Sequence, residues 1–221
     1  MLTVLDLHLN KESNMENKFI KQLLEYCAIL ENDKLTEVGD CISLRAKGGI
    51  YITDATKAMK DMTADDVKFI TEGANEIEKL HFAIYNAKED INAIIMNHAT
   101  YCVGVAKKCK KLYAVLDDMA QIVGRTAKVA ASYDEDVVVN TLKGRDACLI
   151  KNGGVIATGR TLDEAHTGSL VLEKGAKAYV EATILGNAVK IGVIDAFIMR
   201  TVYKLKYSKK DQSAKLAEME E

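Results

Sequence analysis

The 221-residue sequence contains no proline and no tryptophan, and aromatic residues make up only 6% of it. Without proline, turns and helix ends must be formed by glycine, asparagine and aspartate. The sequence also lacks a run of about 18 apolar residues, so no transmembrane helix is expected. Its first 14 residues contain Asp6 and no basic leader, which is not typical of a secretion signal, so we expect a cytoplasmic protein.

Excess charge of either sign is missing as well. Thirty basic residues against 32 acidic ones give a net charge of -2, so we expect neither nucleic acid nor a membrane as a partner. The five cysteines form no CxxC motif, and we expect reduced thiols that pack as small apolar residues. A chain of this length that is 48% hydrophobic can bury one α/β core.

No repeat, linker or shift in composition divides the chain. We expect one domain over residues 15–207, because Met15 opens a helix-like stretch. Residues 1–14 are expected to form an N-terminal extension, and residues 208–221 a polar, frayed tail.

Apolar residues recur at helical spacing in six stretches. In residues 16–33 one face carries Phe19, Leu23, Cys27 and Leu30. In residues 161–185 the spacing predicts one buried seam, made of Leu162, Ala165, Ser169, Leu172, Ala176, Tyr179 and Thr183. The other predicted helices cover residues 75–87, 100–109, 134–144 and 197–207.

Glycine-containing turns predict two β-hairpins. The first spans residues 41–55 around Lys47-Gly48-Gly49, and the second spans residues 147–159 and turns at Asn152-Gly153. With the helices, these hairpins indicate a single-domain α/β protein whose helices cover both faces of a sheet.

Between the hairpins the pattern is less regular. Residues 91–96 are predicted to form a buried strand, and residues 112–116 a short strand followed by helical turns. Thr63 and Asp66 have the spacing of a capping box, which predicts the start of a helix.

Three longer stretches resemble a known family. They read ITDATKAMKDMTADD (residues 52–66), LHFAIYNAKEDINAIIMNHATY (80–101) and ACLIKNGGVIATGRTLDEAHTGSLVLEKGAKAYVEA (147–182). Together they resemble the class II aldolase/adducin family, and within it the sugar-phosphate aldolases of the fuculose-phosphate type. The resemblance covers roughly residues 16–200. It implies a three-layer α/β/α sandwich around a mixed, largely antiparallel sheet, and a homo-oligomer, commonly a tetramer.

The resemblance also implies a chemistry. Family members cleave a carbon–carbon bond of a phosphorylated sugar in a retro-aldol step, with a zinc ion on three imidazoles polarising the carbonyl. A glutamate moves a proton, loops of small polar residues hold the phosphate, and a tyrosine assists.

The zinc ligands of this pattern are mostly absent from the sequence. The family's His-x-His positions carry Met96 and His98 here, and the third histidine position carries Gly153. A thioether is a poor zinc ligand and glycine supplies none. His98 is therefore either a remnant of a metal site or an ordinary structural or solvent-facing histidine.

The positions of the base and of the phosphate-binding loops have changed too. The catalytic glutamate position carries Ile77, and one of the phosphate-binding serine positions carries Glu76, whose carboxylate would repel a phosphate. The family's tyrosine position falls near Asp117. Lys57, in an altered phosphate loop, is a candidate contact for a small phosphorylated or anionic ligand. The full set of candidate ligand-binding residues is Asp40, Cys41, Thr53, Thr56, Lys57, Asn75 and Asn97.

Two functions follow as alternatives. The first is a protein of the aldolase type with degenerate zinc, base and phosphate sites, which binds or assembles without catalysis and needs no cofactor. The second is an active lyase whose site has been rebuilt around zinc or another divalent metal, for example from Glu76, Glu78, His81 and His98. Bound metal distinguishes the two. His81 alone is predicted to pack or hydrogen-bond within a helix, and His166 to lie at the surface or in an interface.

Overall fold

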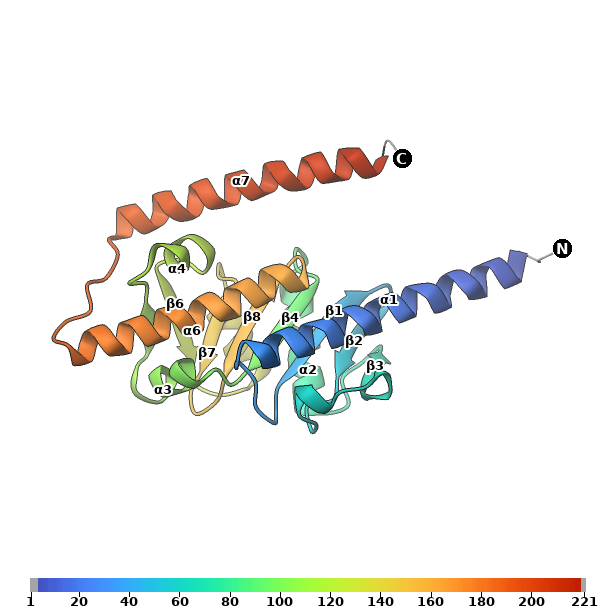
Figure 1. The fold of residues 1–221 in the computed structure, drawn as a ribbon, viewed down its shortest axis with the longest axis horizontal. Helices are drawn as coiled ribbons and strands as arrows, with labels where there is room; N and C mark the ends of the chain where they lie inside the picture. Colours follow the sequence, from blue (N-terminus) through green and yellow to red (C-terminus); the bar gives the residue numbers. More distant parts are fainter. Residues whose placement is uncertain (1–3, 220–221) are drawn as a thin grey trace.

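The computed structural model describes the backbone of residues 4–219 and the side chains of residues 15–206. Within this part of the chain, eight strands form one sheet in the order β3-β2-β1-β4-β8-β7-β6-β5 (Figure 1). Only the β6–β7 pair is parallel, so the sheet is mixed and largely antiparallel. The strands are β1 (Cys41–Ala46), β2 (Gly49–Thr53), β3 (Val67–Ile70), β4 (Ala93–Asn97), β5 (Lys111–Tyr113), β6 (Thr126–Ala130), β7 (Ala147–Ile150) and β8 (Val155–Gly159).

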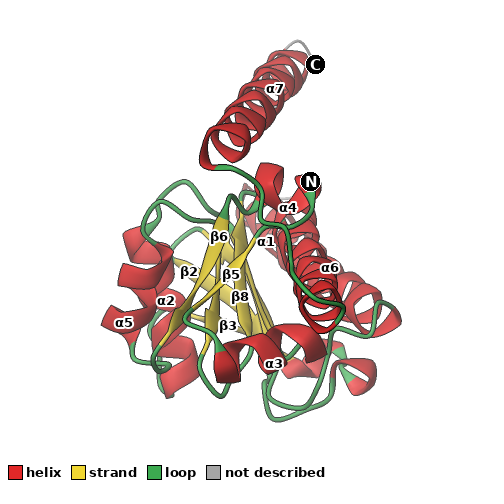
Figure 2. Ribbon diagram, turned by 90° about the vertical axis from the view of Figure 1, so that its left-hand side faces the viewer, coloured by secondary structure: helices red, strands yellow, loops and turns green. Residues whose placement is uncertain are grey.

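Helices cover both faces of the sheet, which confirms the expected three-layer sandwich. On one face lie α2 and α5, and on the other lie α1, α3, α4 and α6 (Figure 2). The helices are α1 (Val4–Asn32), α2 (Glu76–Ala87), α3 (Thr100–Lys108), α4 (Asp117–Ile122), α5 (Glu135–Leu142), α6 (Leu162–Ile184) and α7 (Val193–Met219).

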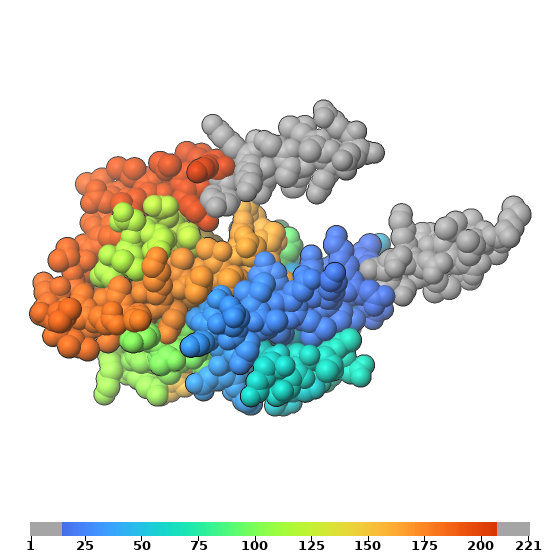
Figure 3. Space-filling view, in the orientation of Figure 1, coloured from blue at the N-terminus to red at the C-terminus, as the bar shows by residue number. Residues whose placement is uncertain are grey.

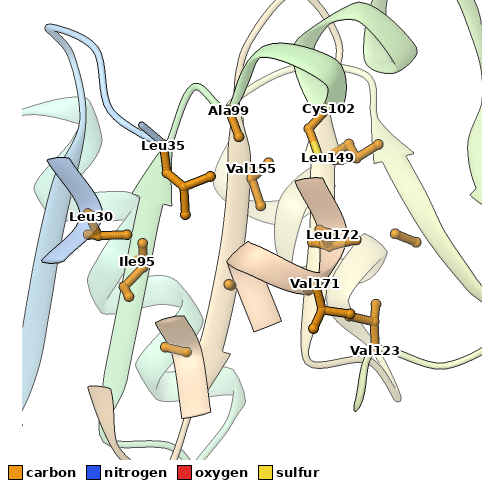
Figure 4. Packing of buried hydrophobic residues seen from close by; sticks show 14 of the residues in the cluster. Leu30, Leu35, Ile95, Ala99, Cys102, Val123, Leu149, Val155, Val171 and Leu172 are labelled. Atoms are coloured by element: carbon orange, nitrogen blue, oxygen red, sulfur yellow. The ribbon is translucent and has the colours of Figure 1, made fainter. Parts of the chain in front are cut away.

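β4 lies in the middle of the sheet and has a hydrophobic cluster on each side. Ile94 and Met96 point into the cluster under α2 and α5, and Ile95 points into the cluster under α1 and α6 (Figure 4). A strand buried on both faces is apolar at successive positions, which explains the continuous run in this part of the sequence. The buried side chain of Asn97 ends the strand.

The predicted apolar seams of α1 and α6 are buried on the sheet. Figure 3 shows α6 (orange) lying between α1 (blue) and α4 (yellow-green). Leu23 and Leu30 of α1 are fully buried. The α6 seam is buried as far as Ala176, whereas Tyr179 is half-buried and Thr183 is exposed. The last turns of α6 extend beyond the sheet (Figure 1), so the seam has no strand to cover there.

The structure adds two strands to those predicted. The capping box at Thr63 is present, with the Thr63 N–H donating to the Asp66 carboxylate at 2.7 Å, but it opens a single 3-10 turn that leads into β3. β6 replaces part of the predicted helical turns, and β5 ends at Tyr113, before Leu116.

Both ends of the chain are more helical than predicted. α1 begins at Val4, and α7 begins at Val193 and continues to Met219, so the backbone of the predicted tail is helical as far as Met219. The side chains of residues 1–14 and 207–221 lie outside the described part, and the division into extension, domain and tail stays a prediction. Within the described residues, no helix has both the length and the apolar character needed to cross a bilayer.

Candidate functional site

His98 follows β4 directly, and both of its ring nitrogens face protein groups. Its Nδ1 is hydrogen-bonded to the Asp40 carboxylate, and its Nε2 lies 3.3 Å from the Tyr133 hydroxyl. The Tyr133 hydroxyl in turn accepts a hydrogen bond from the Gly154 backbone N–H at 3.1 Å. These contacts join the ends of β1 and β4 to the loop before α5 and to the β7–β8 turn.

Burial and hydrogen bonding have opposite effects on the pKa of His98 and on the pKa of Asp40. The pKa of His98 is raised, chiefly by its hydrogen bond to Asp40, although partial burial opposes the rise. Burial raises the pKa of Asp40, and the hydrogen bonds from His98 and from the Glu37 N–H oppose that rise. The hydrogen bond between the two side chains orients the imidazole.

Three segments that carry candidate ligand-binding residues lie close together. The Asp40–His98 hydrogen bond joins the turn before β1 to the end of β4. The Gly39 N–H donates to the Ala55 carbonyl at 3.1 Å, which joins the same turn to the loop after β2.

The residues present do not fit a zinc ion. Met96 is buried in the hydrophobic cluster under α2 and α5, and His98 has no ring nitrogen without a protein partner. A Cβ atom on Gly153 would lie 2.4 Å from the Tyr133 hydroxyl, so the tyrosine occupies the space of a side chain at this position. In the described part of the chain, no group of three or more His, Cys, Asp or Glu side chains is arranged to hold a metal.

A cavity of about 370 Å³ lies beside the altered phosphate loops. It is lined by Ile52, Thr53, Asp54, Ala55, Thr56, Lys68, Asn75, Glu76, Ile77 and Glu78, three of which belong to the predicted ligand-binding set. Three carboxylates and one lysine are among them, so the cavity repels an anion more than it attracts one. Two of its polar side chains are hydrogen-bonded to each other. The Asp54 carboxylate accepts hydrogen bonds from the Thr56 N–H at 2.9 Å and from the Thr56 hydroxyl at 2.7 Å.

The N-terminus of α2 forms one wall of this cavity. Asn75 caps the helix, accepting a hydrogen bond from the Glu78 N–H at 2.9 Å. The Glu78 carboxylate returns to the Ala74 N–H at 2.8 Å. Glu78 is thus used by the capping box, and Ile77, predicted to lie at the position of the family's base, packs against the hydrophobic cluster under α2.

Three other predicted ligand-binding residues face different partners. The Lys57 ammonium pairs with Asp66 at 2.7 Å. The Asn97 amide donates to the Ser169 hydroxyl of α6, on the opposite face of the sheet from Met96. Cys41 points toward His81 of α2, with 3.3 Å between Sγ and Nε2.

His81 belongs to a polar network that is wholly buried behind the site. Its Nδ1 lies 2.7 Å from the Ser43 hydroxyl, which lies 2.9 Å from the Tyr85 hydroxyl. Burial lowers the pKa of His81 to about 3, so the imidazole is neutral, and burial raises the pKa of the Cys41 thiol. The predicted role of His81 in packing and hydrogen bonding is confirmed.

Two further residues can now be placed. A tyrosine, Tyr133, lies beside His98, whereas Asp117, near which the family's tyrosine was expected, begins α4. Tyr133 directly precedes the predicted helix of residues 134–144, but β6 before it was not predicted, so nothing in the sequence directed it toward His98. His166 is partly buried where α6 meets α1, with its Nε2 2.7 Å from the Asp33 carboxylate, in line with the interface alternative of its prediction.

Comparison with known proteins identifies the family. The sequence profile of the class II aldolase and adducin N-terminal domain matches residues 21–180. The chain belongs to this family. Among class II aldolases, the L-fuculose phosphate aldolase of Methanococcus maripaludis (strain S2) is 25% identical over 176 residues, which cover 72% of this chain and 94% of that protein. The protein of the same name from Escherichia coli (strain K12) is 25% identical over 190 residues, covering 79% and 88%.

Solved class II aldolase structures share the fold. An L-fuculose 1-phosphate aldolase superposes with a TM-score of 0.78 at 23% identity, covering 85% of this chain and 96% of that one. The L-fuculose-1-phosphate aldolase from Thermus thermophilus superposes with a TM-score of 0.70 at 19% identity, covering 80% and 100%. The class II aldolase fold is thus present over most of the chain.

Proposed function

We propose that this chain is a class II aldolase-fold protein without zinc-dependent retro-aldol activity, and that it serves by binding or assembly. The observation that carries the proposal is the contact of Tyr133 with both His98 and the β7–β8 turn. The Tyr133 hydroxyl contacts the Nε2 atom of His98, and it also occupies the space that a side chain at position 153 would need.

The residue at the predicted position of the proton-transferring glutamate supports the same conclusion. The position of the proton-transferring glutamate holds an apolar side chain, Ile77, and the neighbouring Glu78 is committed to capping α2. Loss of a general base removes a contribution of about 10²- to 10⁴-fold to a reaction of this kind. Metal, base and phosphate contacts are altered together inside a preserved fold.

The cavity beside α2 is the candidate binding site. Its excess of carboxylates favours a neutral or cationic polar ligand over the phosphorylated sugar implied by the resemblance. An anionic ligand at Lys57 would have to displace the Asp66 carboxylate. Family resemblance also supports a homo-oligomer, a tetramer in much of the family, in the cytoplasm.

An assay for carbon–carbon bond cleavage tests the proposal. The full chain is incubated with L-fuculose 1-phosphate and with other phosphorylated ketoses and aldoses, with and without added zinc. A zinc-loaded L-fuculose phosphate aldolase serves as the positive control. The expected result is no aldehyde product above the rate without enzyme. Cleavage that zinc stimulates and a chelator abolishes would contradict the proposal and establish a lyase with a rebuilt site.

A further inference from the structure

α7 carries apolar side chains on two opposite faces. On the inner face Ala196 is buried, while Met199 and Tyr203 are half-buried, and this face packs on α4. These residues recur at spacings of three and four, as expected for the face of a surface helix that covers a core. The inner face therefore accounts for the attachment of α7 to the rest of the molecule.

The opposite face of α7 is apolar as well, and its large side chains are exposed in the described part of the chain. We call this face the outer stripe; it consists of Ile194, Phe197, Ile198, Thr201, Val202 and Leu205. Its five large apolar side chains are each 54–74% exposed. Figure 3 shows the described part of α7, in red, at the surface next to α4.

The outer stripe has a defined length. At the same helical spacing, the sequence continues with Ser208, Lys209 and Gln212, so the apolar pattern ends at Leu205. A contiguous apolar patch of this size on a soluble protein marks an interaction site. A helix that is apolar on both faces is normally buried between two partners.

We propose that the outer stripe is the contact between two copies of this chain, which pair their α7 helices antiparallel about a twofold axis. The axis passes between residues 199 and 200, at the middle of the stripe. Ile194 then lies opposite the partner's Leu205, and Phe197 opposite the partner's Val202. A twofold interface repeats each contact, so the single stripe is self-complementary along its whole length.

The charges along one edge of the stripe fit this arrangement. At 100° per residue, Asp195 and Lys206 lie on the same edge, near opposite ends of the stripe. Antiparallel pairing sets each Asp195 beside the partner's Lys206, twice per dimer. Parallel pairing would instead bring Lys206 beside the partner's Lys204, a like-charge contact. The antiparallel pair is therefore the favoured one.

The extent of the stripe suits a second copy. A stable interface buries about 800 Å² on each partner. Five large side chains that are more than half exposed supply the greater part of that area, and Val193, 62% exposed, adds to it at the other edge. An anionic membrane surface is disfavoured as the occupant because Asp195 would face the headgroups.

Light scattering of the purified full chain across a range of concentrations tests the contact. The wild type is expected to be a dimer or a larger even-numbered assembly, and Phe197→Glu is expected to halve its mass. The dissociation constant of the contact should rise about 30-fold or more, as for a central aromatic residue of an interface. The matched control is Phe69→Glu, which changes a 44% exposed phenylalanine on β3 and should leave the mass unchanged.

Charge reversal tests the antiparallel register. Asp195→Lys and Lys206→Glu should each weaken the assembly, and the double variant should restore it. A monomeric wild type, an unchanged mass in Phe197→Glu, or a double variant weaker than both single ones would overturn the proposal. Binding of the wild type to vesicles with anionic lipids, lost in Phe197→Glu and without self-association, would assign the stripe to a membrane instead. Each outcome is independent of zinc content and lyase activity, so this inference and the proposed function fail separately.

Discussion

At the scale of single residues, Tyr133 makes the central contacts of the candidate site. Its hydroxyl contacts the imidazole of His98 and accepts a hydrogen bond from Gly154, so one side chain joins segments that zinc ligands would join in the family pattern. Asp40 holds the other ring nitrogen of His98. Both ring nitrogens of this imidazole therefore have protein partners.

This account predicts that a zinc site can be restored. In the triple variant Met96→His, Gly153→His, Tyr133→Ala, three imidazoles surround the space vacated by the tyrosine, and Asp40 remains in place to orient His98. We expect about one zinc per chain, measured by elemental analysis after dialysis. The matched control keeps Tyr133 and carries only the two histidine substitutions. Because the tyrosine would clash with the new side chain at position 153, the control should bind no zinc; equal zinc in both variants would rule out the role given to Tyr133.

His81 gives a second prediction at this scale. Burial lowers its pKa to about 3, whereas an unfolded chain has a histidine pKa of about 6.5. Between these values the unfolded state takes up a proton that the folded state does not, so the free energy of unfolding falls as the pH falls through this window. The loss attributable to His81 is about 2 kcal/mol between pH 7 and pH 5.

Urea unfolding at the two pH values measures this effect. His81→Asn should be less stable at pH 7, but its further loss at pH 5 should be smaller than that of the wild type by the same amount. If wild type and variant lose equal stability between pH 7 and pH 5, then His81 is not held neutral by burial.

Part of the site could be predicted from the residues alone. The absence of imidazoles at Met96 and Gly153, and of a carboxylate at Ile77, follows directly from the resemblance. The contact of Tyr133 with His98 does not, because the two residues are 35 positions apart and meet only after β6, β7 and β8 have paired. The position of a side chain in space depends on this long-range pairing, which residue types do not reveal.

At the scale of elements, a cluster of charges attaches α7 to the sheet. The Asp146 carboxylate at the start of β7 lies 2.7 Å from the Arg200 guanidinium, 3.5 Å from the Lys88 ammonium and 3.6 Å from the Lys204 ammonium. Burial raises the pKa of Asp146, but Lys204, Arg200 and Lys88 together bring it below its usual range. Arg200 also donates to the Ile122 carbonyl at 2.8 Å, which ties the same cluster to α4.

Removing this carboxylate should loosen α7. Asp146→Asn is expected to lower the local stability of the helix by about 1 kcal/mol, after allowance for solvent screening, and so to speed hydrogen exchange of amides 196–206 about fivefold. The matched control, Glu181→Gln, removes an exposed pair with Lys177 at 4.0 Å and should have little effect.

The pH dependence of this attachment has a definite sign. Because the folded-state pKa of Asp146 is lowered, its contribution is complete above the unfolded pKa of about 3.9 and is lost as the pH falls through the lower folded value. Exchange that is as fast in the control as in Asp146→Asn would contradict the anchoring role.

Elements with strong local patterns could be predicted from the sequence, and short ones could not. The long apolar seams of α1 and α6 and the glycine turns of both hairpins carry their own signals. β3 has four residues and follows a capping box, so the local signal favoured a helix. β6 carries the exposed Lys128 among partly buried neighbours, and its strand conformation depends on pairing with β5 and β7.

At the scale of the whole molecule, the chain has the class II aldolase fold. One mixed sheet carries a hydrophobic cluster on each face, so the candidate site lies within a continuous, well-packed core. Surfaces outside the site remain available for other functions, and the outer stripe of α7 is the clearest of them. Binding and assembly use such surfaces without requiring a metal.

Elemental analysis of the full chain, purified without an affinity tag or chelator, tests the central claim most directly. The protein is measured as isolated and again after incubation with excess zinc and gel filtration. Less than about a tenth of a zinc or other divalent ion per chain, in both states of a folded protein, is the result that we predict. About one tightly held ion per chain would contradict the account, since it would require ligands other than those that Tyr133 and Asp40 now occupy.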